Sequence, residues 1–173
     1  MKTNLYTVTV PLLAKHLMIL GELLEKAEAH AAGGEEVVRL VNGKLAEDMF
    51  SLGRQIELAT DTAKGAASRL SGKEMLRFAD GDHAIETLKG RLRDTLAYLA
   101  TVSESDFDGD EERMIELPFY QGKALSAFDY ATGFALPNFY FHVTVAYAIL
   151  RKEGVSLGKL DYLGSLPFVD LPG

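Results

Sequence analysis

The sequence contains no cysteine and carries few positive charges. The absence of cysteine excludes disulfides, zinc–thiolate sites, iron–sulfur clusters and thiol nucleophiles, and it fits the reducing cytoplasm. Eighteen Lys and Arg residues stand against 25 Asp and Glu, which gives a formal net charge of −7. No basic stripe or polybasic tail is present that would bind a phosphate backbone. We therefore expect a cytoplasmic protein without a nucleic-acid partner.

The sequence also lacks an apolar run typical of a membrane span or an export signal. Its N-terminus is too polar for a secretory signal peptide. The most apolar stretch, Phe134–Leu150, contains Pro137, Asn138 and His142 and is shorter than the roughly 20 apolar residues that a bilayer requires. We expect a buried core helix there and no membrane partner.

Apolar residues recur three and four positions apart in four long stretches, as they do on the buried face of a helix. The predicted helices cover Thr9–Ala31, Leu45–Leu70, 85–99 and Pro137–Leu150. Ser71-Gly72 is expected to end the second helix, and Asp82 to cap the third. Arg91 is placed on the solvated side of the third helix.

The connections between these helices predict a single all-α domain, 1–173, built as a four-helix bundle. Lys73–Asp82 is long enough to cross the bundle between the second and third helices. Before the fourth helix, Met114–Phe119 and Lys123–Phe128 flank Tyr120-Gln121-Gly122. This pattern is typical of a small β-hairpin.

Two shorter segments complete the predicted architecture. Glu35–Leu40 is expected to form a short helical turn after Gly33-Gly34 breaks the first helix. The C-terminal segment, Gly154–Gly173, is punctuated by Pro and Gly. It is expected to pack on the bundle as an irregular tail through Leu157, Leu160, Tyr162, Leu163 and Phe168.

His142 lies among apolar residues of the fourth predicted helix, so we expect it to be buried with at least one hydrogen-bond partner. One interpretation is a core histidine that holds the helices in register. The other is a polar pocket between the second and fourth helices that binds a ligand. Its predicted lining residues are Asp48, Gln55, Asn138, His142 and Tyr147.

The sequence resembles an uncharacterised bacterial family, the domain of unknown function DUF1993. The segments that carry the resemblance are Leu45–Leu52, Pro137–His142, Ala146–Arg151 and Gly158–Gly164. This family is grouped with the DinB/YfiT-like helical bundles, many of which bind metal and some of which are thiol-dependent transferases. The resemblance implies an up-down-down-up bundle, in agreement with the long crossover.

The metal-binding pattern of DinB-like bundles is not complete in this chain. That pattern has one histidine on the second helix and a His-x-x-x-His pair on the fourth, so that three imidazoles converge on a divalent cation. The second predicted helix has no histidine, and the positions four before and four after His142 are Asn138 and Ala146. We therefore predict neither a bound metal nor another cofactor.

Three functional hypotheses follow. The first is a cytoplasmic bundle that binds a small molecule or a partner protein in the polar pocket, without a metal triad. The second is a DinB-like transferase or hydrolase with a rewired metal site, in which His142 is the acid or base and Asp48 or Tyr147 assists. The third is self-association as a homodimer through the hairpin edge or an exposed helix face.

Overall fold

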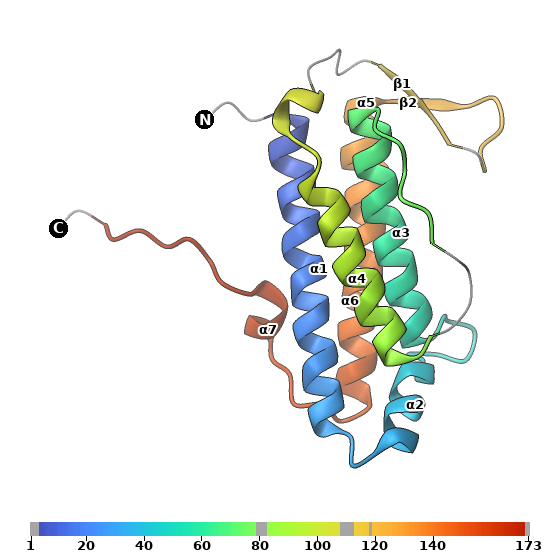
Figure 1. Cartoon of the computed structure of the whole chain (residues 1–173), viewed down its shortest axis with the longest axis vertical. Helices are drawn as coiled ribbons and strands as arrows, with labels where there is room; N and C mark the ends of the chain where they lie inside the picture. Colours follow the sequence, from blue (N-terminus) through green and yellow to red (C-terminus); the bar gives the residue numbers. More distant parts are fainter. Residues whose placement is uncertain (1–3, 79–82, 108–112, 118, 172–173) are drawn as a thin grey trace.

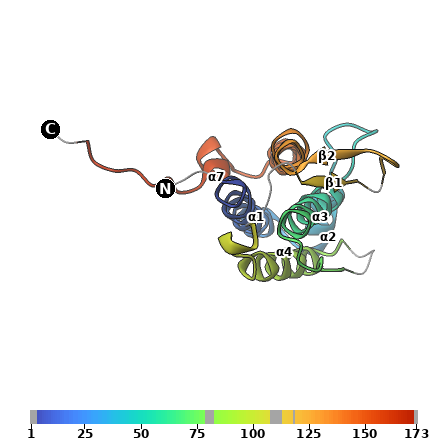
Figure 2. The same ribbon diagram turned by 90° about the horizontal axis from the view of Figure 1, so that it is seen from above.

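Four long helices surround the core in the computed structural model, which describes residues 4–78, 83–107, 113–117 and 119–171. They are α1 (Leu5–His30), α3 (Leu52–Ser71), α4 (Ile85–Ala100) and α6 (Leu136–Lys152). Helices α1 and α6 run in one direction and α3 and α4 in the other (Figure 1). Seen end on, the four helices enclose one core (Figure 2). The predicted up-down-down-up bundle, with its crossover between α3 and α4, is confirmed.

Helix α1 begins at Leu5, before the predicted start at Thr9, because Asn4 caps it. The Asn4 side chain accepts a hydrogen bond from the Thr7 backbone N–H at 2.9 Å, and the Thr7 hydroxyl accepts one from the Asn4 backbone N–H at 3.0 Å. This reciprocal pair satisfies donors that the first helical turn would otherwise leave free. The buried face of α1 carries Leu13, Leu17, Leu20, Leu23 and Leu24.

Helix α3 begins at Leu52, so the predicted start at Leu45 is wrong. Residues 43–51 form a loop in which Leu45, Asp48 and Phe50 are exposed. The loop folds back on itself, because the Leu52 N–H donates to the Gly43 carbonyl at 2.9 Å. At the other end the prediction is confirmed: Gly72 has a φ of 76°, a left-handed conformation that ends the helix at low cost for glycine.

Helix α4 buries the predicted apolar seam through Leu88, Leu92 and Leu99. Arg91, in contrast, is not on the solvated side. Its side chain is 10% exposed and donates to Asp61 at 2.6 Å and to Thr60 at 2.8 Å, both on α3. Acceptors on the neighbouring helix therefore hold this cation inside the bundle. The predicted cap, Asp82, lies outside the described residues.

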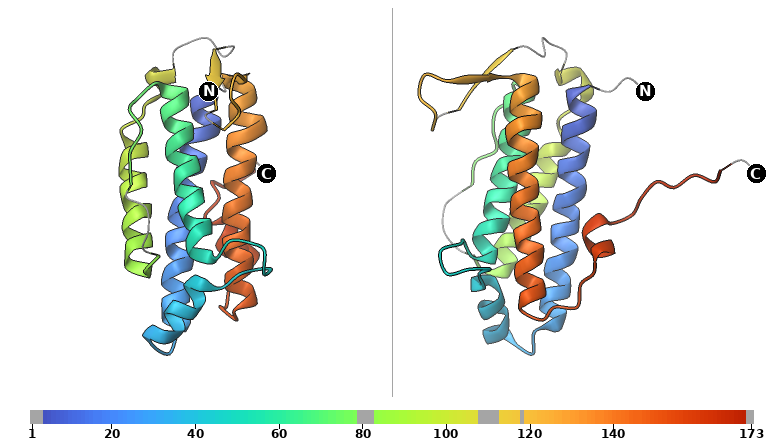
Figure 3. Two further views of the ribbon diagram at one scale, coloured as in Figure 1. Left: turned by 90° about the vertical axis from the view of Figure 1, so that its right-hand side faces the viewer. Right: turned by 180° about the vertical axis from the view of Figure 1, so that it is seen from behind.

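A small hairpin precedes the last long helix, as predicted. Strands β1 (Met114–Glu116) and β2 (Ala124–Ser126) pair antiparallel, with Ile115 opposite Leu125. The hairpin extends sideways from the end of the bundle near the beginning of α5 (Figure 3). The predicted turn at Glu35–Leu40 is also helical, as part of α2 (Gly34–Asn42). A 3₁₀ turn, η1 (Glu104–Phe107), follows α4.

The last long helix is preceded by helical structure that the sequence did not indicate. Helix α5 (Ala127–Asp129) starts where the Ser126 side chain accepts from the Asp129 N–H, and it leads through a π-helical turn, η2 (Tyr130–Ala135), into α6. The Leu136 N–H bonds five residues back, to Ala131. Pro137 has no N–H, and its ring would crowd a carbonyl in a regular helix. The wider turn before it accommodates that ring.

The C-terminal segment packs less than predicted. Leu157 is buried, and α7 (Lys159–Leu163) lies against α1, with Lys26 bound to Asp161. Leu160, however, is 77% exposed and Phe168 is 86% exposed, so the prediction that they pack on the bundle is wrong. Lys15 of α1 donates to the Ser165 carbonyl at 3.0 Å, and residues 166–171 extend away from the helices (Figure 1).

Two helical runs, Leu5–His30 and Ala127–Lys152, are long and apolar enough to cross a membrane by length and composition alone. Core helices of a bundle meet the same criterion. In this structure both runs pack against α3 and against each other. Their apolar faces thus form much of the bundle core.

Candidate functional site

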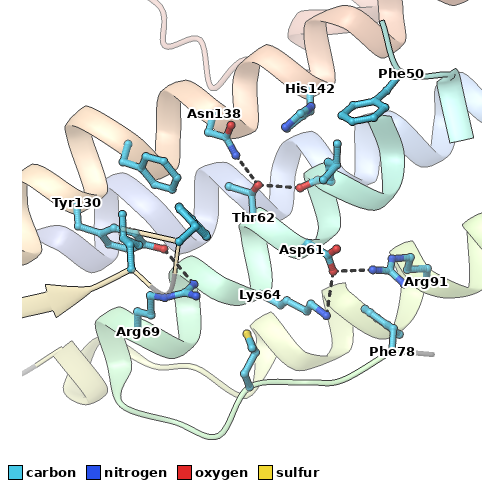
Figure 4. Close-up of a pocket in the computed structure, with 15 residues that line it drawn as sticks. Phe50, Asp61, Thr62, Lys64, Arg69, Phe78, Arg91, Tyr130, Asn138 and His142 are labelled. Carbon is cyan, nitrogen blue, oxygen red and sulfur yellow. Dashed lines mark hydrogen bonds and ion pairs between the residues drawn. The ribbon is translucent and has the colours of Figure 1, made fainter. Parts of the chain in front are cut away.

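A cavity of about 600 Å³ lies between α3 and α6 and is bordered by Met75 and Phe78 of the crossover segment and by the hairpin (Figure 4). Helix α3 contributes Leu58, Asp61, Thr62, Lys64 and Arg69. The π-helical turn and α6 contribute Tyr130, Phe134, Asn138 and His142. The remaining wall consists of Phe50, Met75, Phe78, Arg91, Leu117 and Phe119. The cavity is therefore largely aromatic and aliphatic, with its polar groups on the two long helices.

His142 is held by a buried glutamine on the neighbouring helix. Its Nδ1 lies 2.8 Å from Oε1 of Gln55, and Nε2 of Gln55 donates to the Phe50 carbonyl at 3.3 Å. This second bond orients the amide so that its oxygen faces the imidazole. Nδ1 therefore carries the proton, and Nε2 is an acceptor.

The acceptor nitrogen of His142 opens into the cavity. No described residue forms a hydrogen bond with it, and in the described part of the chain only the Tyr98 hydroxyl is a buried side-chain polar atom without a partner. Burial lowers the pKa of His142, and the nearby charge of Arg54 lowers it further. The ring is thus neutral at physiological pH, with a lone pair directed at the cavity.

Asn138 presents a second acceptor one helical turn before His142. Its Nδ2 donates to Oγ1 of Thr62 at 2.8 Å, and Thr62 donates to the Leu58 carbonyl at 2.7 Å (Figure 4). These bonds fix the amide of Asn138. Its Oδ1 has no partner among the residues that the structure describes. Two hydrogen-bond acceptors therefore stand side by side on α6.

Two of the three cations that line the cavity share one carboxylate. Asp61 accepts from Arg91 at 2.6 Å and from Lys64 at 2.9 Å. Both cations also lie over the Phe78 ring, at 4.2 Å for Arg91 and 4.6 Å for Lys64. Arg91 additionally lies 3.9 Å from Glu57, a buried carboxylate behind the cavity. Glu57 also accepts from Arg54 at 2.5 Å and lies 3.0 Å from Nε2 of His83, so the ion pairs of this wall continue behind the cavity.

The third cation, Arg69, has no carboxylate partner in the described residues. Its Nη1 lies 3.5 Å from the Tyr130 hydroxyl, and its guanidinium lies 5.9 Å from the centre of the Tyr130 ring. Burial raises the pKa of Tyr130, so the phenol stays neutral and supplies no charge. The cavity lining as a whole therefore carries more positive than negative charge.

The structure brings together three of the five predicted site residues. Asn138 and His142 line the cavity, and Gln55 supports His142 from behind. Asp48 does not take part, because it is exposed in the loop before α3. Tyr147 does not either: its ring packs against Tyr162 at 5.8 Å. Five residues turn a helix by about 500°, so Tyr147 faces away from the side of His142.

Sequence reasoning missed the cationic and aromatic part of the wall. No functional role was predicted for Lys64, Arg69 or Phe78. One signal was available: Tyr130, Phe134, Asn138 and His142 follow one another at intervals of four. Such spacing is typical of one helix face.

The donor set does not fit the three-imidazole metal site of DinB-like bundles. Nδ1 of His142 is occupied by Gln55, and the nearest polar neighbours of its ring are amides. In the described ranges, no three His, Asp or Glu side chains converge. The chemistry that these residues offer is hydrogen bonding and proton acceptance by His142.

Comparison with known proteins identifies relatives of this chain. The family model described as "Domain of unknown function (DUF1993)" matches residues 5–163. The crystal structure of a DinB family member protein from Shewanella denitrificans is 38% identical, with a TM-score of 0.89. The match covers 98% of this chain and 100% of that one. No curated protein matches.

Proposed function

Because this chain belongs to the DUF1993 family of DinB-like helical bundles, whose function is unknown, we propose a function from its own cavity: it binds a small organic molecule between α3 and α6. The observation that carries this proposal is the pair of acceptors, Nε2 of His142 and Oδ1 of Asn138, set one turn apart in largely apolar walls. Both acceptors face an open cavity where water can reach them, and a ligand donor would take the place of that water.

The size and chemistry of the cavity support a ligand of modest size. Small-molecule sites usually enclose about 300 to 1,000 Å³ and combine apolar walls with a few fixed polar groups. The volume here, about 600 Å³, falls within that range. Apolar contact would supply most of the affinity, and the two acceptors would orient a hydroxyl or amine of the ligand.

A fragment screen by protein-detected NMR tests this proposal. Fragments with an apolar body and a hydroxyl or amine are expected to shift the resonances of His142 and its neighbours. Leu58→Trp fills part of the cavity and should abolish the shifts, whereas Leu160→Trp places the same side chain on the exposed surface and should leave them. The proposal fails if donor-bearing fragments leave the cavity resonances unchanged.

A second candidate function is an enzyme in which His142 accepts a proton from the ligand. The neutral imidazole with its free Nε2 favours this candidate, although Asp48 is exposed in the loop before α3 and Tyr147 packs against Tyr162. If a bound fragment is turned over, the rate should rise with pH through the lowered pKa of His142, because the unprotonated ring is the base. His142→Gln should then reduce the rate at least about 100-fold while the fragment still binds.

A further inference from the structure

We infer that the ligand of this cavity is an apolar monocarboxylate whose carboxylate binds Arg69, which rests on the small-molecule binding proposed above. A hydroxyl or amine at the other end of the same ligand would meet Asn138 and His142.

Arg69 is the cation of the wall without a carboxylate partner among the described residues. Lys64 and Arg91 are bound to Asp61, whereas the polar neighbour of the Arg69 guanidinium is the neutral Tyr130 side chain. A guanidinium carries five N–H donors, and its planar fork matches the two oxygens of a carboxylate. A half-buried Arg with most donors unused is therefore suited to a bidentate oxyanion.

Gly65 places the guanidinium against α3. A Cβ at Gly65 would lie 2.5 Å from Nη1 of Arg69, so a side chain at this position would displace the guanidinium. Because Gly65 is buried, the space that it leaves lies inside the bundle. Tyr130 then covers Arg69 from the side of α6 (Figure 4). The missing side chain at Gly65 thus directs a long cation into the cavity.

The pairing of charges in the wall favours a single negative charge on the ligand. Asp61 accepts from both Lys64 and Arg91. Glu57 behind Arg91 is bound to Arg54 at 2.5 Å, so this second pair adds no net charge. Arg69 is thus the lining cation without a carboxylate partner among the described residues. A monocarboxylate would pair with it, whereas a phosphate dianion would bring more negative charge close to Asp61.

The length of the ligand follows from the positions along α3. Asn138 contacts Thr62, three residues from Gly65, and His142 lies one helical turn beyond Asn138 on α6. At about 1.5 Å per residue, the two acceptors lie roughly 5 and 10 Å along the helices from the Arg69 guanidinium. One aromatic ring between a carboxylate and a hydroxyl or amine spans the nearer part of this interval. Phe134 and Phe119 line the cavity as apolar surfaces for such a ring.

The test compares three probes by protein-detected NMR titration: 4-hydroxybenzoate, its uncharged isostere 4-hydroxybenzamide, and phenyl phosphate. The acid is expected to bind at least tenfold more tightly than the amide and the phosphate. Arg69→Gln should remove the preference for the acid. Arg93→Gln, which removes an exposed arginine of α4, should retain it.

A second variant keeps the charge and changes only its position. Gly65→Ala should weaken binding of the acid at least tenfold, because the new methyl group displaces the guanidinium. Gly90→Ala is the matched control, since its Cβ would lie at an ordinary 3.5 Å from Nη2 of Arg93. It introduces the same methyl group in a helix, outside the cavity, and should leave the affinity unchanged.

The outcomes separate this inference from the function on which it rests. If the acid and the amide shift the cavity resonances with equal affinity, the cavity binds small molecules but the carboxylate inference is wrong. The same holds if phenyl phosphate binds more tightly than the acid, or if Arg69→Gln keeps the preference. If no probe shifts these resonances at about 10 mM, the inference is wrong. The fragment screen then tests separately whether the cavity binds small molecules.

Discussion

Replacing Gln55 by Leu should destabilise the protein by about 1 to 3 kcal/mol. Gln55 is 1% exposed and His142 is 8% exposed, so water cannot easily replace the bond between them. Leucine has a similar volume, and the change therefore leaves little cavity. The cost arises because Nδ1 of His142 keeps its proton and loses its acceptor. The Phe50 carbonyl also loses a donor, but Phe50 is in an exposed loop where water can replace it.

A double-mutant cycle separates this bond from other effects. His142→Phe alone leaves the Gln55 oxygen unpaired and should cost a similar amount. With both partners apolar, no buried polar group is left without a partner. The double variant should therefore lose about 1 to 2 kcal/mol less stability than the two single variants lose together. Urea unfolding followed by circular dichroism measures all four proteins.

The control is Gln121→Leu, which changes the other glutamine of the chain at an exposed position in the hairpin turn. It should change the free energy of unfolding by less than about 0.5 kcal/mol. If Gln55→Leu is equally mild, or if the two single changes add without coupling, the bond does not hold His142 as described. The tautomer assigned to His142 would then lose its basis.

Three further results are expected. Gly72→Ala should destabilise the protein by about 1 kcal/mol, because alanine is strained at a φ of 76°. Gly21→Ala, in open space on α1, should instead stabilise it by about 0.5 to 1 kcal/mol, and urea unfolding measures both changes. Burial lowers the pKa of His16 and of His142 below 6.5, so the unfolded chain binds more protons than the folded one. The free energy of unfolding should therefore fall as the pH falls below 6.5, and this decrease should be smaller in His16→Leu. Removing residues 166–173 should change the midpoint of thermal unfolding by less than about 2 °C, because the described side chains of this segment are exposed.

The bundle could be predicted from the sequence because its signals are local. Apolar residues at helical spacing mark α1, α4 and most of α3, and Gly72 ends α3 where the pattern stops. The hairpin was likewise visible from its turn residues. None of these features needs information about which helices touch. Spacing along one segment is sufficient.

The errors occurred where contacts between distant segments decide the structure. Leu45, Met49 and Leu52 continue the apolar spacing of α3 toward the N-terminus, yet residues 43–51 fold as a loop. Asp48 was predicted to line the pocket from a helix that does not extend so far. Tyr147 was also predicted to line the pocket, although its ring packs against Tyr162 of α7. Periodicity predicts a face, but it does not say which element covers that face.

The positively charged residues of the cavity could not be predicted for the same reason. Composition gives a net charge of −7, from which we expect no surface that binds phosphate backbones. It says nothing about a cavity in which Lys64, Arg69 and Arg91 converge. Arg91 reaches its partner Asp61 across 30 positions of sequence, and Arg69 meets Tyr130 across 61. In a short stretch of sequence, charged residues that pair over such separations have the same pattern as residues exposed to solvent. A locally positive site can therefore lie within an acidic protein, and only the packing of α3 against α4 and α6 reveals it.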